Sequence, residues 1–246
     1  MLLKLKLLHV PIASLLCMLL LTTDLVYFAV HITSALITGT RHPLFSLDVE
    51  RSYGEIFQYI KEFWLFLLLL VAARVTGERS YWSWAAIFFF LLCDDTLQIH
   101  ETVGGVISSQ LRLETVLRFR AQDIGELLAS GIAGSLLLAV FVIAYARGSE
   151  LYRRITLDLG LLFGLLVFFG VGVDFLHSAL TVGKRSDFAV GLIEDGGEML
   201  AMSLLVWYSF RSAALGWARP PVFIFDLILS NAGARRLTAL IMFRRH

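Results

Sequence analysis

The sequence predicts an all-α protein, a polytopic membrane helix bundle with six transmembrane helices, and two observations lead to this fold class. Hydrophobic residues make up 58% of the 246-residue chain, whereas soluble domains contain about 45–50% apolar residues. These residues are also gathered into six segments, each close to or above the length of about 20 residues that a helix needs to cross a bilayer.

The predicted helices follow one another with charged or glycine-containing loops between them. The first begins just after the basic N-terminus MLLKLKLLHV, and its apolar stretch continues without the small-residue cleavage site of a removed signal peptide. The second is centred on FWLFLLLLVAA, and the third begins with WSWAAIFFF. In order, the six helices are expected over residues of about 8–37, 57–75, 82–104, 123–146, 156–182 and 189–212.

Lysine and arginine residues predict the topology, because cytoplasmic loops of membrane proteins carry an excess of them. With the N-terminus inside, 13 of the 21 basic residues fall on the inner side, and Lys61 is counted on the outer side. We therefore expect both termini in the cytoplasm of a bacterial inner membrane. Residues 1–213 are expected to form the transmembrane domain, and residues 214–246 a basic amphipathic tail on the inner membrane surface.

The net charge of +1 gives no electrostatic reason to expect a nucleic-acid partner. The apolar composition instead makes membrane lipids and a lipid-soluble small molecule the expected partners. Both cysteines lie in apolar segments, so a disulfide framework is not expected.

Four of the predicted helices carry ionisable residues toward the same, outer side of the membrane. Charged groups inside a bilayer are costly, usually face the bundle interior, and often mark functional sites. Because every residue of this set shifts together if the topology is reversed, the convergence does not depend on the orientation. The set consists of Asp94, Asp95, His100 and Glu101 in the third helix, Asp123 and Glu126 in the fourth, Asp174 and His177 in the fifth, and Glu194, Asp195 and Glu198 in the sixth.

Helical spacing predicts that these residues form narrow polar stripes. On one continuous helix, Asp94, Gln98 and Glu101 lie within about 60° of one another. Asp174 and His177 are three residues apart and therefore also share a face. Each helix would thus direct its polar groups toward one site.

Two of the predicted hairpins resemble each other. The segment QDIGELLA (122–129) is identical to EDGGEMLA (194–201) at five of eight positions. Each segment follows a helix that carries DTLQ (95–98) or DFLH (174–177). Since both hairpins run out and then in, we predict a parallel repeat about an axis along the membrane normal.

So many carboxylates at one depth favour a bound cation, because neighbouring like charges otherwise raise one another's pKa. Carboxylates with histidine suit a divalent metal, with iron or manganese preferred and zinc also open. Asp95, Asp123, Glu194 and Asp195 are the candidate catalytic residues, which would support the ligands or carry protons. The candidate metal ligands are Asp94, His100, Glu101, Glu126, Asp174, His177 and Glu198.

The run DDTLQIHE (94–101), followed by EDGGE (194–198), resembles a DDxxxxHE…EDGGE signature of uncharacterised bacterial multi-pass membrane proteins. That resemblance covers the third to sixth helices and implies no activity. The predicted site is also loosely similar to di-iron carboxylate bundles, in which two Glu residues and two Glu-x-x-His motifs hold the metals. The chain departs from that pattern at Gln98, where a ligand histidine would stand.

The residues leave several functions open. The first is a metal-dependent membrane enzyme, oxidoreductase-like, that acts on a lipid-soluble substrate near the outer leaflet. The second is a transporter for a divalent cation or protons, and the third is a zinc-dependent lipid hydrolase similar to alkaline ceramidases, although the chain lacks their HxxxH pair. Asp24 and His31 could line the same cavity, whereas Glu55 and Glu62 are expected to be solvated at the interface.

Overall fold

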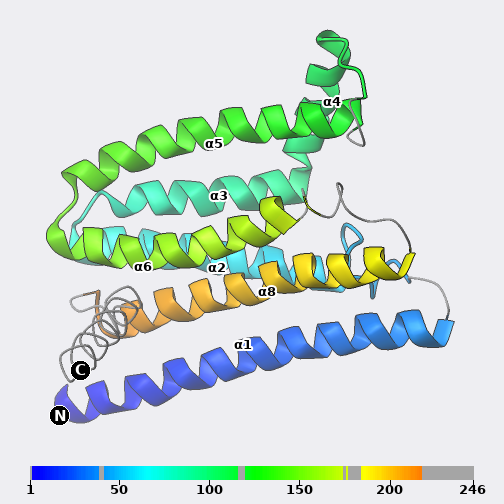
Figure 1. Ribbon diagram of the computed structural model, residues 1–246. Helices are drawn as coiled ribbons and strands as arrows, with labels where there is room; N and C mark the ends of the chain where they lie inside the picture. Colours follow the sequence, from blue (N-terminus) through cyan, green and yellow to red (C-terminus); the bar gives the residue numbers. More distant parts are fainter. Residues whose placement is uncertain (1, 39–41, 116–119, 174–175, 177–183, 218–246) are drawn as a thin grey trace, which may run out of the picture.

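The computed structural model describes residues 2–38, 42–115, 120–173, 176 and 184–217, and every regular element in these residues is helical. The helices lie side by side, and α4 turns away from them at one end (Figure 1). The elements are α1 (Leu2–Thr38), α2 (Tyr53–Thr76), α3 (Tyr81–Leu97), α4 (Ile99–Gln110), α5 (Ala121–Arg147), α6 (Glu150–Val167), the π-helix η1 (Phe168–Val173) and α8 (Lys184–Ala214).

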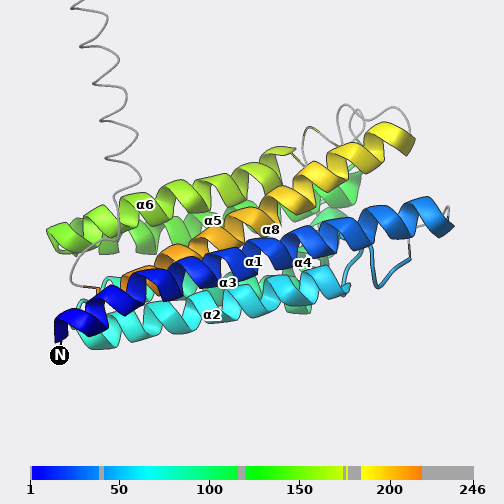
Figure 2. The same cartoon turned by 90° about the horizontal axis from the view of Figure 1, so that it is seen from below.

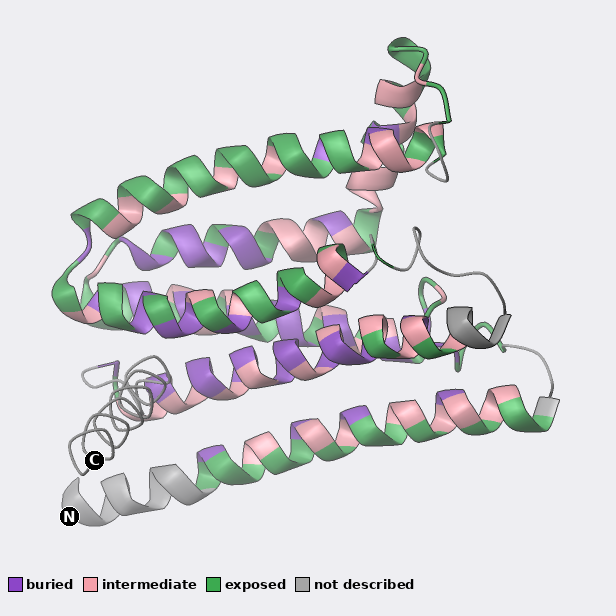
Figure 3. Ribbon diagram, viewed as in Figure 1, coloured by how far each residue is buried: buried purple, intermediate pink, exposed green. Residues whose placement is uncertain are grey.

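Four of these helices are long and apolar enough to cross a membrane, which agrees with the predicted all-α membrane class. They cover Ile12–Ile37, Tyr53–Thr76, Ala121–Arg147 and Glu150–Val173. The outward face of α5 is almost entirely exposed (Figure 3), and its leucines include Leu136, which is 67% exposed. An exposed apolar surface of this extent is suited to lipid. With 17 residues, α3 is shorter than these spans, and the first turns of α8 carry several charges.

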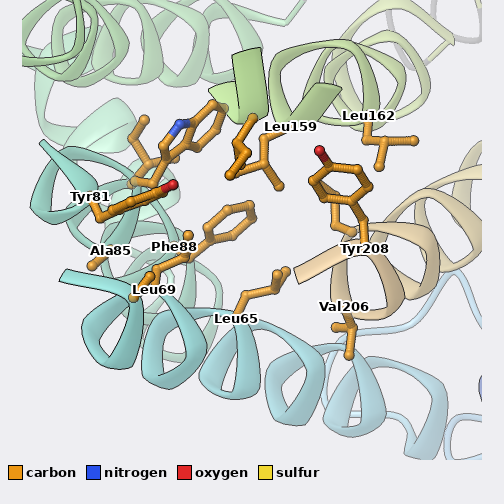
Figure 4. Close-up of a cluster of buried hydrophobic side chains, with 14 of the residues drawn as sticks. Leu65, Leu69, Tyr81, Ala85, Phe88, Leu159, Leu162, Val206 and Tyr208 are labelled. Atoms are coloured by element: carbon orange, nitrogen blue, oxygen red, sulfur yellow. The ribbon is translucent and has the colours of Figure 1, made fainter. Parts of the chain in front are cut away.

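The helices of the bundle interior meet in one apolar core. Helix α8 lies against α1, α2 and α6, and α2 lies against α3. Leu65, Leu69, Phe88, Leu159 and Tyr208 converge on the same space from α2, α3, α6 and α8 (Figure 4). In a bilayer, such close packing stabilises the bundle through van der Waals contact, because lipid tails are as apolar as the core itself.

The helix predicted over 82–104 is interrupted in the structure. Gln98 has a left-handed backbone (φ 53°), so α3 ends at Leu97 and α4 begins at Ile99 in a new direction. The carboxylate of Asp94 stabilises this break, because its Oδ1 accepts a hydrogen bond of 2.8 Å from the backbone N–H of His100. Asp94, Gln98 and Glu101 therefore do not form the continuous stripe predicted above.

Helix ends elsewhere follow local sequence signals. The hydroxyl of Ser52 accepts the N–H of Glu55 at 3.3 Å at the start of α2, and Gly77 (φ 70°) ends that helix. The hydroxyl of Ser149 accepts the N–H of Tyr152 at 3.2 Å at the start of α6. Such side chains satisfy N–H groups that have no partner inside the helix.

Candidate functional site

An acidic pocket lies at the end of the bundle where α2 and α8 begin and α3 ends, on the right in Figure 1. Its volume is about 500 Å³, and half of the residues that line it are aspartate or glutamate. The remaining lining residues include no lysine, arginine or histidine from the part of the chain that is described. The lining carboxylates are Asp48, Glu50, Glu55, Asp95, Glu194, Asp195 and Glu198.

The loop 42–52 forms one wall of the acidic pocket, and contacts with α1 and α2 hold it in place. The backbone N–H of Leu47 donates a 3.1 Å hydrogen bond to Nδ1 of His31, which is buried in α1. Leu47 also packs onto Gly54, where a Cβ would come within 2.7 Å of the leucine Cδ2. His31 therefore acts on the wall of the pocket and does not line it.

One contact at the acidic pocket brings two carboxyl groups together. Glu62 is only 2% exposed, and its carboxyl lies within interaction range of that of Asp95, with Glu198 close by. Two ionised carboxylates this close repel each other, so the contact favours a proton held by one of them or a cation bound between them. Glu62 does not line the pocket but contacts it through Asp95, and its burial shows that it is not a solvated interface residue.

Two buried acceptor atoms beside this contact lack a donor among the described residues. They are Oε2 of Glu62 and Oε1 of Gln58, and Gln58 also lines the acidic pocket. Buried polar atoms are nearly always paired, because an unsatisfied one forfeits the hydrogen bonds it made in water. Both atoms are acceptors, so the group that would satisfy them is either a cation or a hydrogen-bond donor.

Glycine allows the π-helix to approach the pocket. A Cβ at Gly170 in η1 would lie 2.9 Å from Oε1 of Glu198, so a larger residue here would require this carboxylate to shift. In the same interface, a Cβ at Gly197 would come within 2.2 Å of the Phe169 ring. π-Helical turns of this kind are frequent at functional sites.

A buried ion pair lies directly behind the pocket. Nζ of Lys61 is 3.2 Å from Oδ1 of Asp24, and it also donates to the Met199 carbonyl at 2.9 Å and the Ser203 hydroxyl at 3.3 Å. Ser203 in turn donates to Oδ2 of Asp24 at 2.6 Å. Lys61 is therefore an interior residue of α2, which corrects its assignment to the outer loops.

The remaining acids of the third and fourth predicted helices lie beside the pocket or away from it. Nδ1 of His100 is 3.1 Å from Oδ2 of Asp94, so these two residues pair with each other. Glu101 in α4 is close to Glu50 on the pocket rim, and burial, followed by the contact with Glu50, raises the pKa of Glu101 to about 6. None of these three predicted ligands lines the acidic pocket itself.

Asp123 and Glu126 have local roles at the start of α5. Asp123 accepts the backbone N–H of Arg120 at 2.8 Å and pairs with its guanidinium at 2.7 Å, which caps the helix. Glu126 accepts a 2.8 Å hydrogen bond from Gln122 and packs on Gly104 of α4. Neither residue lines the acidic pocket.

The structure thus brings Asp95, Glu194, Asp195 and Glu198 together in one pocket. Asp174 and His177 lie outside the described residues. Within those residues, no three histidine, cysteine, aspartate or glutamate side chains are grouped closely enough to hold a metal ion as they stand. Sequence reasoning missed Lys61, whose signal was a lysine and an aspartate in two neighbouring apolar segments.

The chain matches the model of a family described as a domain of unknown function (DUF8692) over residues 12–213. The chain belongs to this family. The matched residues contain every lining residue of the acidic pocket as well as the Lys61–Asp24 pair. Comparison with curated proteins gave no match, and neither did comparison with solved structures.

Proposed function

We propose that this membrane protein binds a divalent cation in the acidic pocket. The observation that supports this most directly is the close approach of the Glu62 and Asp95 carboxyls, with buried acceptors of Glu62 and Gln58 beside it. A cation would satisfy those acceptors and offset the repulsion among the seven lining carboxylates. Binding would draw the carboxylates closer together than they lie in the structure.

The donor groups favour a hard cation. The lining residues offer carboxylate oxygens, the amide of Gln58 and the hydroxyl of Tyr59. Magnesium, calcium and manganese prefer oxygen ligands, whereas zinc prefers more nitrogen or sulfur. Of the two metals preferred from the sequence, iron and manganese, we therefore propose manganese as the bound cation.

The surroundings support a fixed site more than a path for ions. The ammonium group of Lys61 lies behind Glu62 and would repel a cation that moved inward. Beyond it, Leu65 and Leu69 belong to the fully buried apolar core. A transporter for the same cation would need a polar continuation through this region.

The size of the pocket supports an enzyme. At about 500 Å³, it has the dimensions of a small-molecule site, about 300–1,000 Å³, and exceeds what one ion requires. We propose that a lipid-soluble substrate binds beside the cation. A redox-active metal such as manganese would supply oxidoreductase chemistry, and Asp195 and Glu194 would carry protons.

We also propose that α3 and α8 cross the membrane, which gives six crossings with both termini in the cytoplasm of a bacterial inner membrane. In support, both helices run alongside the four candidate spans in two perpendicular views (Figures 1 and 2). The interior position of Lys61 removes one basic residue from the outer side and so strengthens the charge bias. The parallel repeat would relate the α3–α5 segment to the η1–α8 segment.

Manganese binding to the purified full-length protein tests the cation site. We expect Glu62→Gln and Asp95→Asn to weaken binding at least about tenfold in isothermal titration calorimetry, corresponding to about 1.4 kcal/mol. Glu150→Gln is the matched control, because Glu150 starts α6 at the opposite end of the bundle. Unchanged binding by both pocket variants, or none by the wild type, would refute the proposal.

Manganese uptake into proteoliposomes separates the two classes of function. A fixed site predicts bound metal without flux. Flux that disappears in Glu62→Gln would instead establish the transporter. The uptake assay distinguishes binding from transport, and the calorimetric experiment separately tests whether the acidic pocket is the binding site.

A further inference from the structure

A second pocket, which we call the aromatic pocket, lies at the end of the bundle opposite the acidic pocket. Its volume is about 440 Å³, and this open pocket is bordered by the loop after α2, the start of α6 and the end of α8. Tyr81, Tyr152 and Trp217 supply its aromatic wall. None of its lining residues belongs to the cation site proposed above.

The indole N–H of Trp217 lacks an acceptor within the described residues. Trp217 is only 1% exposed, lines the aromatic pocket, and packs against Tyr81 with 5.2 Å between ring centroids. Buried tryptophan N–H groups usually find a hydrogen-bond partner. The nitrogen itself is almost inaccessible, so an acceptor oxygen of a ligand in the aromatic pocket would satisfy it once the side chains around the indole shift.

The backbone holds Trp217 in an unfavourable conformation. Its φ is 55°, in the left-handed region that bulky residues rarely adopt. Hydrogen bonds of 2.8 Å from Trp217 N to Ser212 O and from Gly216 N to Ala213 O fix this turn. Strained residues persist where the surrounding structure over-determines them, and they are enriched at ligand sites.

Glu78 supplies a negative charge on the opposite wall. Its carboxylate accepts hydrogen bonds from the N–H and hydroxyl of Ser80 and from the N–H of Ser149, which are all neutral donors. Burial raises the pKa of Glu78, but these hydrogen bonds outweigh it and the net shift is downward. An ionised carboxylate beside the rings of Tyr81 and Tyr152 favours an organic cation, which aromatic faces also attract.

The position of the aromatic pocket indicates the source of such a ligand. One candidate span ends at Thr76 and another starts at Glu150, so the pocket lies where membrane helices reach the bilayer surface. We propose that the aromatic pocket binds the zwitterionic headgroup of a membrane phospholipid. The ammonium group lies beside Glu78, and a phosphate or ester oxygen accepts the Trp217 N–H.

Calorimetric titration of the detergent-purified full chain tests this site. Dihexanoyl phosphatidylethanolamine should bind saturably, and dihexanoyl phosphatidylglycerol, which lacks the ammonium group, at least about tenfold more weakly. Trp217→Phe keeps an aromatic ring but removes the N–H, and should weaken ethanolamine-lipid binding about tenfold. Trp82→Phe is the matched control, because Trp82 is half-exposed and lies outside the aromatic pocket.

A second variant keeps the test independent of Trp217 packing. Glu78→Gln should abolish the preference for the ethanolamine lipid over the glycerol lipid. Glu114→Gln should leave this preference unchanged, because Glu114 is exposed in the connection between α4 and α5, outside the aromatic pocket. Equal binding by Trp217→Phe and Trp82→Phe, or an unchanged preference in Glu78→Gln, would overturn the site. If soluble phosphoethanolamine bound with the same affinity as the lipid, the ligand of the aromatic pocket would not need to be a membrane lipid, and that part of the proposal would be overturned.

Discussion

Nζ of Lys61 lies 3.2 Å from Oδ1 of Asp24, and neither side chain is exposed. The pair joins α1 to α2, and Ser203 and Met199 connect it to α8. All three helices that meet here also approach the acidic pocket, directly or through the loop 42–52. The ion pair thus fixes the elements on which the proposed cation site is built.

Removal of one partner of this pair should be strongly destabilising. Lys61→Met leaves the Asp24 carboxylate buried without its cation, and such changes cost about 3–5 kcal/mol. The double variant Lys61→Met with Asp24→Asn should recover part of this loss. Unfolding in mixed detergent measures both.

The exposed pair between Arg154 and Glu150, at 2.8 Å, provides the control. Exposed ion pairs contribute about 0–1 kcal/mol, so Arg154→Met should have little effect. A loss for Lys61→Met no larger than this would show that the buried pair does not hold the three helices together.

Glu62→Gln should stabilise the protein when no divalent cation is present. The new amide can donate a hydrogen bond to Asp95 without the bound proton or cation that the contact between two carboxyls requires. A typical net hydrogen bond contributes about 0.5–1.5 kcal/mol. Thermal unfolding of the variant and the wild type in a chelating buffer measures the difference.

Manganese should reverse this order. At about 100 times its dissociation constant, a ligand that binds only the folded state adds about 2.7 kcal/mol of stability. The wild type should gain this stabilisation and Glu62→Gln should not. If manganese stabilised both proteins equally, Glu62 would have no part in holding the cation.

His31→Phe should release the loop 42–52. Phenylalanine can retain the ring stacking on Phe188, whose centroid is 4.9 Å away, but it removes the acceptor for the Leu47 N–H. A buried N–H left unsatisfied costs about 1–3 kcal/mol. Hydrogen exchange of residues 44–50 should become faster, whereas His42→Phe, at an exposed position of the same loop, should change little.

Gly104→Ala should separate α4 from α5. A Cβ at this position would lie 2.5 Å from the backbone nitrogen of Glu126, and neither backbone can move aside without disturbing its helix. Overpacking of this kind costs about 1–3 kcal/mol. The neighbouring Gly105→Ala is the control, because its Cβ would meet nothing within 4 Å. Equal unfolding temperatures for the two variants would contradict the close packing.

Glu101 should make stability depend on pH below neutrality. The folded protein raises its pKa from about 4.5 to about 6, through burial and then the contact with Glu50. The folded state therefore binds the proton more tightly than the unfolded state, and stability should fall as pH rises from about 4.5 to 6. Glu101→Gln should remove this part of the slope of unfolding temperature against pH, and an unchanged slope would assign it to other groups.

The helices and the shared position of several acids could be predicted from the sequence. Apolar segments of sufficient length mark helices reliably, because a bilayer requires every backbone hydrogen bond to be made within the helix. Asp95 lies late in the helix predicted over 82–104 and Glu198 early in the helix predicted over 189–212, so their convergence follows from the opposite directions of these two helices. The structure places both in the acidic pocket.

The local geometry of the site could not be predicted in this way. The break at Gln98 depends on one carboxylate, that of Asp94, which reaches the His100 N–H across the turn. Lys61 follows the start of α2 closely enough to resemble an interfacial lysine, and only the packing of α1 and α8 reveals its partners. Hydropathy averages over such single contacts and therefore does not detect them.

The sequestration of Lys61 also makes the other lysines useful as markers of sidedness. Water-soluble amine reagents should not reach a fully buried ammonium group. The chain's remaining lysines are Lys4 and Lys6 near the start of α1 and Lys184 at the start of α8, at opposite ends of the bundle (Figure 1). A membrane-impermeant ester applied to sealed, oriented vesicles should therefore modify one group and spare the other, so peptide mass mapping would report the orientation without any engineered tag.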